Sequence, residues 1–200
     1  MSPIEVDQGN ASNARIALTF DAGGPVEPAS KILATLAKYD LHVTFFITGQ
    51  WAQQYPDVVR QIWNAGHEIG NHTMHHPDLT KLPNDQICTE LNQAEAVISN
   101  ITGLTTRPYY RPPYGARDNR VRQITANLGY RTIYWTIDTI DWDPNTTSQM
   151  IIDRVINHLK NGAIVLMHVG SPVEADTLDT LIPMIKQRGY QITTLTEVLQ

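Results

Sequence analysis

Residues 68–79 read EIGNHTMHHPDL, and they join a short predicted strand (68–71) to three of the seven histidines of the chain. His72 and His76 stand four positions apart, and side chains at that spacing on a helix are neighbours. One helical turn would place both imidazole rings on one face, where they could hold one divalent metal ion. The alternative interpretation is a polar surface turn. His75 is one position off this spacing and is expected to point elsewhere.

Seven short apolar runs have the composition of buried strands and end at turn-forming residues. They span residues 15–20, 43–48, 68–71, 109–112, 131–138, 163–167 and 190–193. Segments with the helical spacing of apolar residues lie between them, at 28–39, 51–65 (interrupted at Pro56), 84–101, 119–128, 146–160, 177–187 and 195–200. This alternation predicts right-handed βαβ units around a parallel sheet. Since no run looks like an edge strand, seven strands fit a barrel better than an open sheet.

Length and composition indicate one ordinary globular domain, with 200 residues, 42% hydrophobic and 18% charged residues, and a net charge of −5. We expect a flexible lead-in over residues 1–14, a domain over 15–200, and a monomer. No basic cluster indicates nucleic acid binding, no run of eighteen apolar residues indicates a membrane span, and no signal peptide is evident. Cys88 is the only cysteine, which excludes a disulfide within the chain.

Reactive side chains follow five of the predicted strands. Asp21 ends the first strand, the histidines follow the third, and His168 ends the sixth. The fourth strand runs into residues 111–115 (RPPYG), and the fifth into residues 138–142 (DTIDW). In parallel barrels the carboxyl ends of the strands meet at one face, where active sites are built. The sequence therefore predicts one site made from all five clusters.

These clusters, in this order, resemble the motifs of the NodB-type polysaccharide deacetylases, carbohydrate esterase family 4. Residues 19–23 (TFDAG) resemble the first motif, TFDDG, and residues 72–76 (HTMHH) the second, H-[ST]-x-x-H. Residues 111–115 resemble the third motif, residues 138–142 the fourth, and residues 166–168 (LMH) the fifth. The resemblance covers residues 15–199 and implies an α/β fold, a distorted and incomplete (β/α) barrel with about seven parallel strands.

The resemblance also implies catalytic roles. Asp21 would be the general base that deprotonates water, and Arg111 would pair with Asp21 and orient it. His168 would be the general acid that protonates the leaving amine, with Asp141 orienting its ring. The backbone N–H of Tyr114 would help to hold the oxyanion.

The resemblance further implies a metal and a substrate pocket. His72 and His76 would hold a divalent metal ion, Zn²⁺ or alternatively Co²⁺. Trp135 and Leu166 would wall the pocket for the acetyl methyl group. Trp142 could stack on a sugar ring, although a packing role would explain this tryptophan equally well.

Position 22 departs from the family pattern, because Ala22 stands where the family has the aspartate that is its third metal ligand. Catalytic zinc usually has three protein ligands. Asp21 could ligate the metal directly or through water, another carboxylate could reach in (Asp78 and Asp118 are the candidates), or the site could bind metal poorly. The sequence leaves these three possibilities open.

Three functions are compatible with this pattern. The first is a metal-dependent hydrolase that removes N-acetyl groups from an amino-sugar polymer such as peptidoglycan or chitin, with an O-acetyl xylan esterase as a variant. The second, motivated by Ala22, is a carbohydrate-binding protein with weak or no catalysis. The third is a metal-independent hydrolase of a small cyclic amide. The resemblance implies a carbohydrate partner and a location outside the cell or at the cell envelope.

Overall fold

A parallel β-sheet forms the centre of the protein, whose structure is a computed structural model that describes residues 5–200. The strands follow the order β1-β6-β5-β4-β3-β2-β8-β7, and β9 pairs with the first residues of β2. Their bounds are β1 (Glu5–Val6), β2 (Arg15–Ala22), β3 (Thr44–Ile47), β4 (Glu68–Asn71), β5 (Tyr109–Tyr110), β6 (Arg131–Ile133), β7 (Ile137–Asp138), β8 (Ile164–His168) and β9 (Gln191–Thr193).

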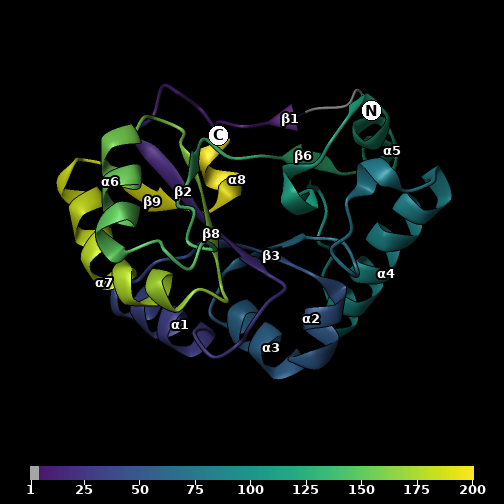
Figure 1. Cartoon of the computed structure of the whole chain (residues 1–200), viewed down its shortest axis with the longest axis horizontal. Helices are drawn as coiled ribbons and strands as arrows, with labels where there is room; N and C mark the ends of the chain where they lie inside the picture. The colour runs from purple at the N-terminus through teal and green to yellow at the C-terminus, as the bar shows by residue number, and fades with distance from the viewer. Residues whose placement is uncertain (1–4) are drawn as a thin grey trace.

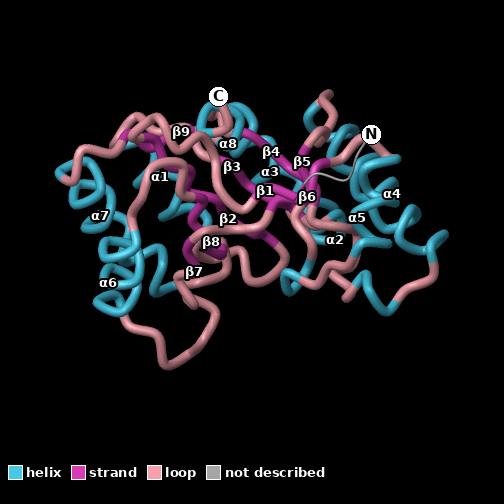
Figure 2. Tube along the Cα trace, turned by 90° about the horizontal axis from the view of Figure 1, so that it is seen from above, coloured by secondary structure: helices cyan, strands magenta, loops and turns pink. Residues whose placement is uncertain are grey.

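Helices α1 to α7 lie outside the curled sheet (Figure 1), whereas α8 packs Leu195 and Val198 in one cluster with Ala17 and Phe46 on the inner side of the sheet. Seen from above in Figure 2, α1, α6 and α7 group at one end of the molecule and α2, α4 and α5 at the other. Their bounds are α1 (Ala29–Lys38), α2 (Gly49–Gln54), α3 (Pro56–Asn64), α4 (Asn84–Thr102), α5 (Asn119–Asn127), α6 (Ser148–His158), α7 (Pro172–Gln187) and α8 (Leu195–Val198). Within residues 5–200, no helix is long and apolar enough to cross a membrane.

The predicted incomplete (β/α) barrel is confirmed, but the strand predicted over 131–138 is wrong. This segment forms two strands at opposite ends of the sheet order, β6 beside β5 and β7 beside β8. Between them the Tyr134 N–H donates to Val6 O at 2.7 Å, and the Thr136 N–H donates to Ile164 O at 2.8 Å. Residues 134–136 therefore join the two edges of the sheet through these hydrogen bonds. In a full barrel, paired strands would occupy this place.

The strand β1 was not predicted, because it lies in the expected lead-in. Glu5 and Val6 pair in parallel with Thr132 and Ile133 of β6. Two residues are too few to show a period-2 pattern, so the sequence carries no signal for this strand. Residues 1–4 of the lead-in lie outside the described residues, and the boundary between lead-in and domain at residue 15 stays a prediction.

The predicted helices are present, with two informative differences at their starts. The helix predicted from residue 177 begins at Pro172, since Ser171 caps it by accepting a hydrogen bond from the Glu174 N–H at 3.2 Å. Asn84 does not cap α4, whose N-cap is Pro83. The Asn84 side chain instead accepts a hydrogen bond from Arg120 at 2.9 Å.

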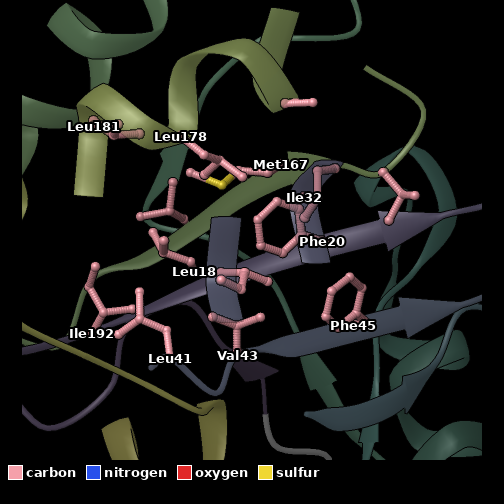
Figure 3. Close-up of a cluster of buried hydrophobic side chains, with 14 of the residues drawn as sticks. Leu18, Phe20, Ile32, Leu41, Val43, Phe45, Met167, Leu178, Leu181 and Ile192 are labelled. Carbon is pink, nitrogen blue, oxygen red and sulfur yellow. The ribbon is translucent and has the colours of Figure 1, made fainter. Parts of the chain in front are cut away.

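The main hydrophobic core lies between the outer face of the sheet and the helices that cover it, with residues from α1, α2, α3, α4, α6 and α7. Figure 3 shows Leu18 and Phe20 of β2 with Phe45 of β3, packed against Ile32 of α1 and Leu178 of α7. Successive side chains of a strand point to opposite faces. Positions 16, 18, 20 and 22 of β2 all belong to this core. Ala22 therefore lies on the helix-facing side of β2, whereas position 21 faces the interior of the curled sheet.

His67 is a buried base that should make the fold sensitive to mild acid. It is 3% exposed, and its Nδ1 accepts a hydrogen bond from the Val43 N–H at 3.3 Å. Burial, helped by the charge of His42, lowers the pKa of His67 from 6.5 to about 4. Between these pH values the unfolded chain binds a proton that the folded chain does not. The free energy of unfolding should therefore fall with decreasing pH, by up to about 1.4 kcal/mol per pH unit from this residue.

Urea unfolding of His67→Gln between pH 7 and 4.5 measures this contribution. We expect the variant to have a shallower pH dependence than the wild-type chain, whatever its stability at pH 7. His158→Gln is the matched control, because His158 is exposed. Equal pH slopes for His67→Gln and the wild-type chain would contradict the assignment.

Candidate active site

The predicted site residues meet in one cleft at the carboxyl ends of the strands. The cleft has a volume of about 1040 Å³, and the predicted residues that line it are Asp21, His72, His76, Tyr114, Trp135, Asp138, Asp141, Trp142, Leu166 and His168. Arg111 is 0% exposed and lies beneath this lining, bonded to Asp21. Asp78 and Asp118, the candidates for a third metal ligand, are not among the lining residues. Both are helix caps: Asp78 accepts from the Thr80 N–H, and Asp118 from the Val121 N–H.

The two metal-ligand histidines lie together, but not on a helical turn. Residues 72–77 form a non-helical loop after β4, in which Thr73 and His76 have φ values of 68° and 60°. The Asn71 side chain holds this loop by accepting a hydrogen bond from the Thr73 N–H at 2.8 Å. The rings of His72 and His76 reach a centroid distance of 4.8 Å. The predicted proximity is therefore found, while the helical geometry behind that prediction is wrong.

Hydrogen bonding fixes the tautomer of His72. Its Nδ1 lies 2.8 Å from the backbone carbonyl of Arg111, which can only accept, so Nδ1 carries the proton. The Nε2 lone pair then faces the cleft, 3.4 Å from Asp21 Oδ2. Burial lowers the pKa of His72 despite the opposing charge of Asp21. Burial and the neighbouring His72 lower the pKa of His76 to about 4. Both rings are therefore neutral at pH 7.

Asp21 and Arg111 form a buried ion pair at the floor of the cleft. Arg111 Nη1 lies 2.8 Å from Asp21 Oδ1, and the guanidinium packs over the ring of Phe46 at 4.3 Å. Burial acts to raise the pKa of Asp21. The charge of Arg111, together with those of His168 and of His72 when this ring is protonated in acid, outweighs burial, and the pKa falls below its ordinary value. Asp21 is thus held ionised, as a base requires.

His168 and Asp141 form a second pair beside the first, on the neighbouring strand β8 and the loop after β7. His168 Nδ1 donates to Asp141 Oδ1 at 2.7 Å, and the His168 backbone N–H donates to Asp141 Oδ2 at 2.9 Å. Burial acts to lower the pKa of His168, but the hydrogen bond and charge of Asp141 outweigh it and raise the pKa. β2 and β8 pair with Asp21 in register with His168. An ionised carboxylate and a histidine with a raised pKa therefore end two adjacent strands.

A strained loop delivers Asp141 to the site. Ile140 has a φ of 55°, which is unusual for a β-branched residue. The Asp138 carboxylate accepts a hydrogen bond from the Ile140 N–H at 2.8 Å, and the Thr146 hydroxyl donates to Ile140 O at 2.7 Å. Asp138 therefore caps this turn and also lines the cleft.

Aromatic side chains form the rim of the cleft. Tyr114 is 74% exposed and Trp142 is 62% exposed. Trp135 stacks on Tyr134 at a centroid distance of 3.8 Å. Gly115, with a φ of 65°, is required beside them, because a Cβ there would lie 2.7 Å from the Tyr134 ring and 2.8 Å from the Trp135 ring. Exposed aromatic rings suit stacking on sugars, but this role stays a prediction.

Sequence reasoning missed two supporting residues. Asn71 is buried at the end of β4, and its amide donates to Leu91 O and to the Tyr130 hydroxyl, both at 3.0 Å. The Ser171 hydroxyl donates to the backbone carbonyl of Asp141 at 3.0 Å. Neither position has a periodic signal. Their only mark in the sequence is that each lies within three residues of a site histidine.

The donor set suits a metal only in part. Two neutral imidazoles beside a carboxylate have the chemistry that zinc sites use. However, among residues 5–200 no three His, Cys, Asp or Glu side chains are arranged to hold an ion. Ala22 supplies no donor, and its methyl group is fully buried. His72 and His76 could therefore hold a metal, but a third protein ligand is not in place.

Known proteins resemble the chain over nearly its whole length. The sequence profile of the family described as Polysaccharide deacetylase matches residues 8–133. The peptidoglycan-N-acetylmuramic acid deacetylase PdaA of Bacillus subtilis is 35% identical, over 96% of this chain and 73% of that protein. The peptidoglycan-N-acetylglucosamine deacetylase of Bacillus cereus is 32% identical, over 96% of this chain and 70% of that protein. The chain therefore belongs to the polysaccharide deacetylase family, carbohydrate esterase family 4, as its motifs predicted.

Similar solved structures include that of a pseudoenzyme. The crystal structure of a carbohydrate esterase family 4 pseudoenzyme from Bacillus anthracis superposes with a TM-score of 0.95 and 32% identity, over 100% of this chain and 70% of that one. A mutant of that pseudoenzyme with restored enzymatic activity superposes equally well, with a TM-score of 0.95. The fold of this chain is thus shared by enzymes and by a protein described as a pseudoenzyme.

Proposed function

We propose that the chain is a hydrolase that removes N-acetyl groups from an amino-sugar polymer of the peptidoglycan or chitin type, at the cell envelope or outside the cell. One observation carries this proposal. Asp21, held ionised by Arg111, and His168, whose pKa is raised by Asp141, end adjacent strands and line the same cleft. Amide hydrolysis needs both a base for water and an acid for the amine. The two peptidoglycan deacetylases among its relatives support this choice of substrate.

In the proposed reaction, Asp21 takes a proton from the attacking water, whose oxygen bonds to the acetyl carbon. The backbone N–H of Tyr114 holds the resulting oxyanion. His168 Nε2 gives its proton to the amide nitrogen as the C–N bond breaks, and the products are acetate and the free amine. Trp135 and Leu166 enclose the acetyl methyl group, while Trp142 stacks on the sugar. The same steps release an O-acetyl group from xylan, with an alcohol as the leaving group.

His72 and His76 are the residues that would hold a divalent ion, with Zn²⁺ or Co²⁺ as the proposed metal. A bound Zn²⁺ supplies Lewis acidity that polarises a carbonyl and makes water more acidic. The chain prepares these two ligands in advance. The carbonyl of Arg111 fixes the ring of His72 with Nε2 toward the cleft, and low pKa values keep both imidazoles neutral.

A second candidate function is carbohydrate binding without turnover. It is favoured by Ala22, which supplies no third ligand, and by the similarity to a pseudoenzyme of this family. The cleft and its exposed rings, Tyr114 and Trp142, would serve this function unchanged.

Acetate release from N-acetylglucosamine oligomers separates these functions. Protein stripped with a chelator is assayed with and without added Zn²⁺ or Co²⁺, and oligomer binding is measured in parallel. Activity restored by metal supports the metal-dependent hydrolase, and activity without metal supports a metal-independent one. Binding without acetate release in any state would overturn the hydrolase proposal in favour of the second candidate.

Ala22→Asp should strengthen metal binding, because the family pattern has an aspartate ligand at this position. Removing one outer-shell partner of a metal site costs about 10–100-fold in affinity, so we expect an added ligand to tighten Zn²⁺ binding at least about tenfold. Without metal the variant should be less stable than the wild-type chain, since position 22 is buried among apolar side chains. Thermal unfolding with and without Zn²⁺ measures both effects. Ala22→Asn is the uncharged control, and an Ala22→Asp midpoint that does not respond to Zn²⁺ would contradict the prediction.

A further inference from the structure

Glu174 is a buried carboxyl group that the proposed reaction does not use. It lies in the first turn of α7 and is 0% exposed. Among the described residues, no donor bonds to either of its carboxyl oxygens. A buried carboxyl group that accepts no hydrogen bond is costly, so its presence needs an explanation. The residues around Glu174, which also form hydrogen bonds with His168, provide this explanation.

The local sequence is typical of a helix capping box, yet the Glu174 side chain does not cap the helix. The Ser171 hydroxyl accepts a hydrogen bond from the Glu174 N–H at 3.2 Å, as in a capping box. The glutamate side chain of such a box would bond the backbone N–H of the serine. Here the Ser171 N–H donates instead to the carbonyl of His168 at 3.3 Å. The Glu174 side chain is thereby left to turn into the interior.

A closed set of hydrogen bonds connects this helix start to the proposed acid. The Ser171 hydroxyl, which accepts from Glu174, donates to the backbone carbonyl of Asp141 at 3.0 Å. The Asp141 carboxylate accepts from both Nδ1 and the backbone N–H of His168. Any change that moves the first turn of α7 therefore reaches His168 through Ser171 and Asp141.

The surroundings of Glu174 suit a carboxylic acid and not a carboxylate. The Thr139 hydroxyl beside it donates its only hydrogen to Leu166 O at 2.9 Å, so toward Glu174 it can only accept. Two neighbouring buried carboxyl groups cannot readily both ionise. Asp141 accepts hydrogen bonds from two donors and therefore carries the negative charge, whereas Glu174 accepts from none. Burial and the charge of Asp141 both raise the pKa of Glu174 well above its ordinary value.

We propose that Glu174 is a positioning residue for His168, acting through Asp141 as a neutral carboxylic acid that donates its proton to the accepting hydroxyl oxygen of Thr139. The proposal rests on the proposed function of His168 as proton donor. A neutral Glu174 fills the space behind Asp141 without adding a second negative charge. Asp141 then remains the one ionised carboxylate of the pair, and its Oδ1 continues to accept the hydrogen bond from the Nδ1–H of His168.

The Nδ1–H proton of His168 is the direct readout, observed by NMR as a downfield resonance in the full chain. Asp141→Asn should abolish this resonance and so assign it. Glu174→Leu should move it upfield and broaden it, because the apolar side chain cannot donate a hydrogen bond, while its burial should keep the fold stable. Glu174→Gln, which is neutral and can donate, should restore it. Thr177→Val is the matched control, because it removes another buried polar group one turn along α7.

Turnover gives a second readout in an active preparation. Glu174→Leu should lower kcat by about tenfold, in the range that loss of outer-shell partners produces at other sites, with KM unchanged. Glu174→Gln should recover most of this loss. If no variant releases acetate, the proposed function fails, yet the NMR resonance still decides the role of Glu174.

Two results would overturn the proposal. One is an Nδ1–H resonance of Glu174→Leu that matches the wild-type chain. The other is a wild-type ¹³C-carboxyl signal showing Glu174 ionised at pH 7, a measurement that needs no variant to fold.

Discussion

Replacing Asp21 with alanine should destabilise the fold by about 3–5 kcal/mol, because it leaves the guanidinium of Arg111 buried without its charged partner. Arg111 is 0% and Asp21 7% exposed, so the guanidinium has little access to bulk water in the folded chain. Arg111 has few other partners: Nη2 donates to Tyr134 O at 3.4 Å, and Nε has no acceptor among the described residues. For a chain of this length, the thermal midpoint should fall by at least about 6 °C.

Two further variants test whether this loss comes from the unpaired charge. Asp21→Asn keeps a neutral acceptor for Arg111 and should cost less than Asp21→Ala. The double variant Asp21→Ala with Arg111→Met removes both charges and should recover much of the stability. Asp176→Ala is the control, since its ion pair with Lys31 is exposed and worth at most about 1 kcal/mol. An Asp21→Ala chain as stable as Asp176→Ala would refute the argument.

The same ion pair sets the direction of an acid effect. The folded pKa of Asp21 lies below its ordinary value of 3.8. Its contribution to stability is therefore fully present above that value and is lost as the pH falls through the folded pKa. Asp21→Asn should remove this part of acid unfolding. All the variants of Asp21 should also lose acetate release, because they remove the proposed base.

The sequence predicted the parts of the fold whose signals are local. Continuous apolar runs such as residues 163–167 are strands in the structure, and the residues that follow them meet at one cleft. The segment 131–138 has the same composition, but its split depends on hydrogen bonds to Val6 and Ile164, which are distant in sequence. A pattern within eight residues cannot report such contacts.

The site shows the same division between residue identity and geometry. The spacing of His72 and His76 indicated that their rings lie together, yet a loop with positive φ values brings them there. The pairings of Asp21 with Arg111 and of His168 with Asp141 agree with the family motifs. Glu174 was not anticipated, because the pattern Ser171-x-x-Glu174 is typical of a helix cap. Only the bond from the Ser171 N–H to His168 shows that this carboxyl is not needed as a cap.

His168→Ala should reduce deacetylation by about 10²–10⁴-fold, the usual contribution of a general acid or base. The loss should depend on the leaving group, because an amine leaves only when it is protonated. An activated ester such as 4-nitrophenyl acetate releases a stable phenolate, which does not need this proton. The variant should therefore lose much more activity on N-acetylglucosamine oligomers than on the ester. Equal losses on both substrates would show that His168 does not act as the acid.

Asp141→Asn tests the same acid through its pKa. The bond and charge of Asp141 raise the pKa of His168, so the protonated acid persists to higher pH than an isolated imidazole would. Deacetylation should fall as the pH rises through this pKa, and in Asp141→Asn the fall should occur at lower pH. Stability should follow the same direction: the charged His168 stabilises the fold below the unfolded pKa of about 6.5, and this contribution disappears as the pH rises through the folded value. A kcat profile whose alkaline limb does not move in Asp141→Asn would separate this limb from His168 and assign it to another group in the cleft.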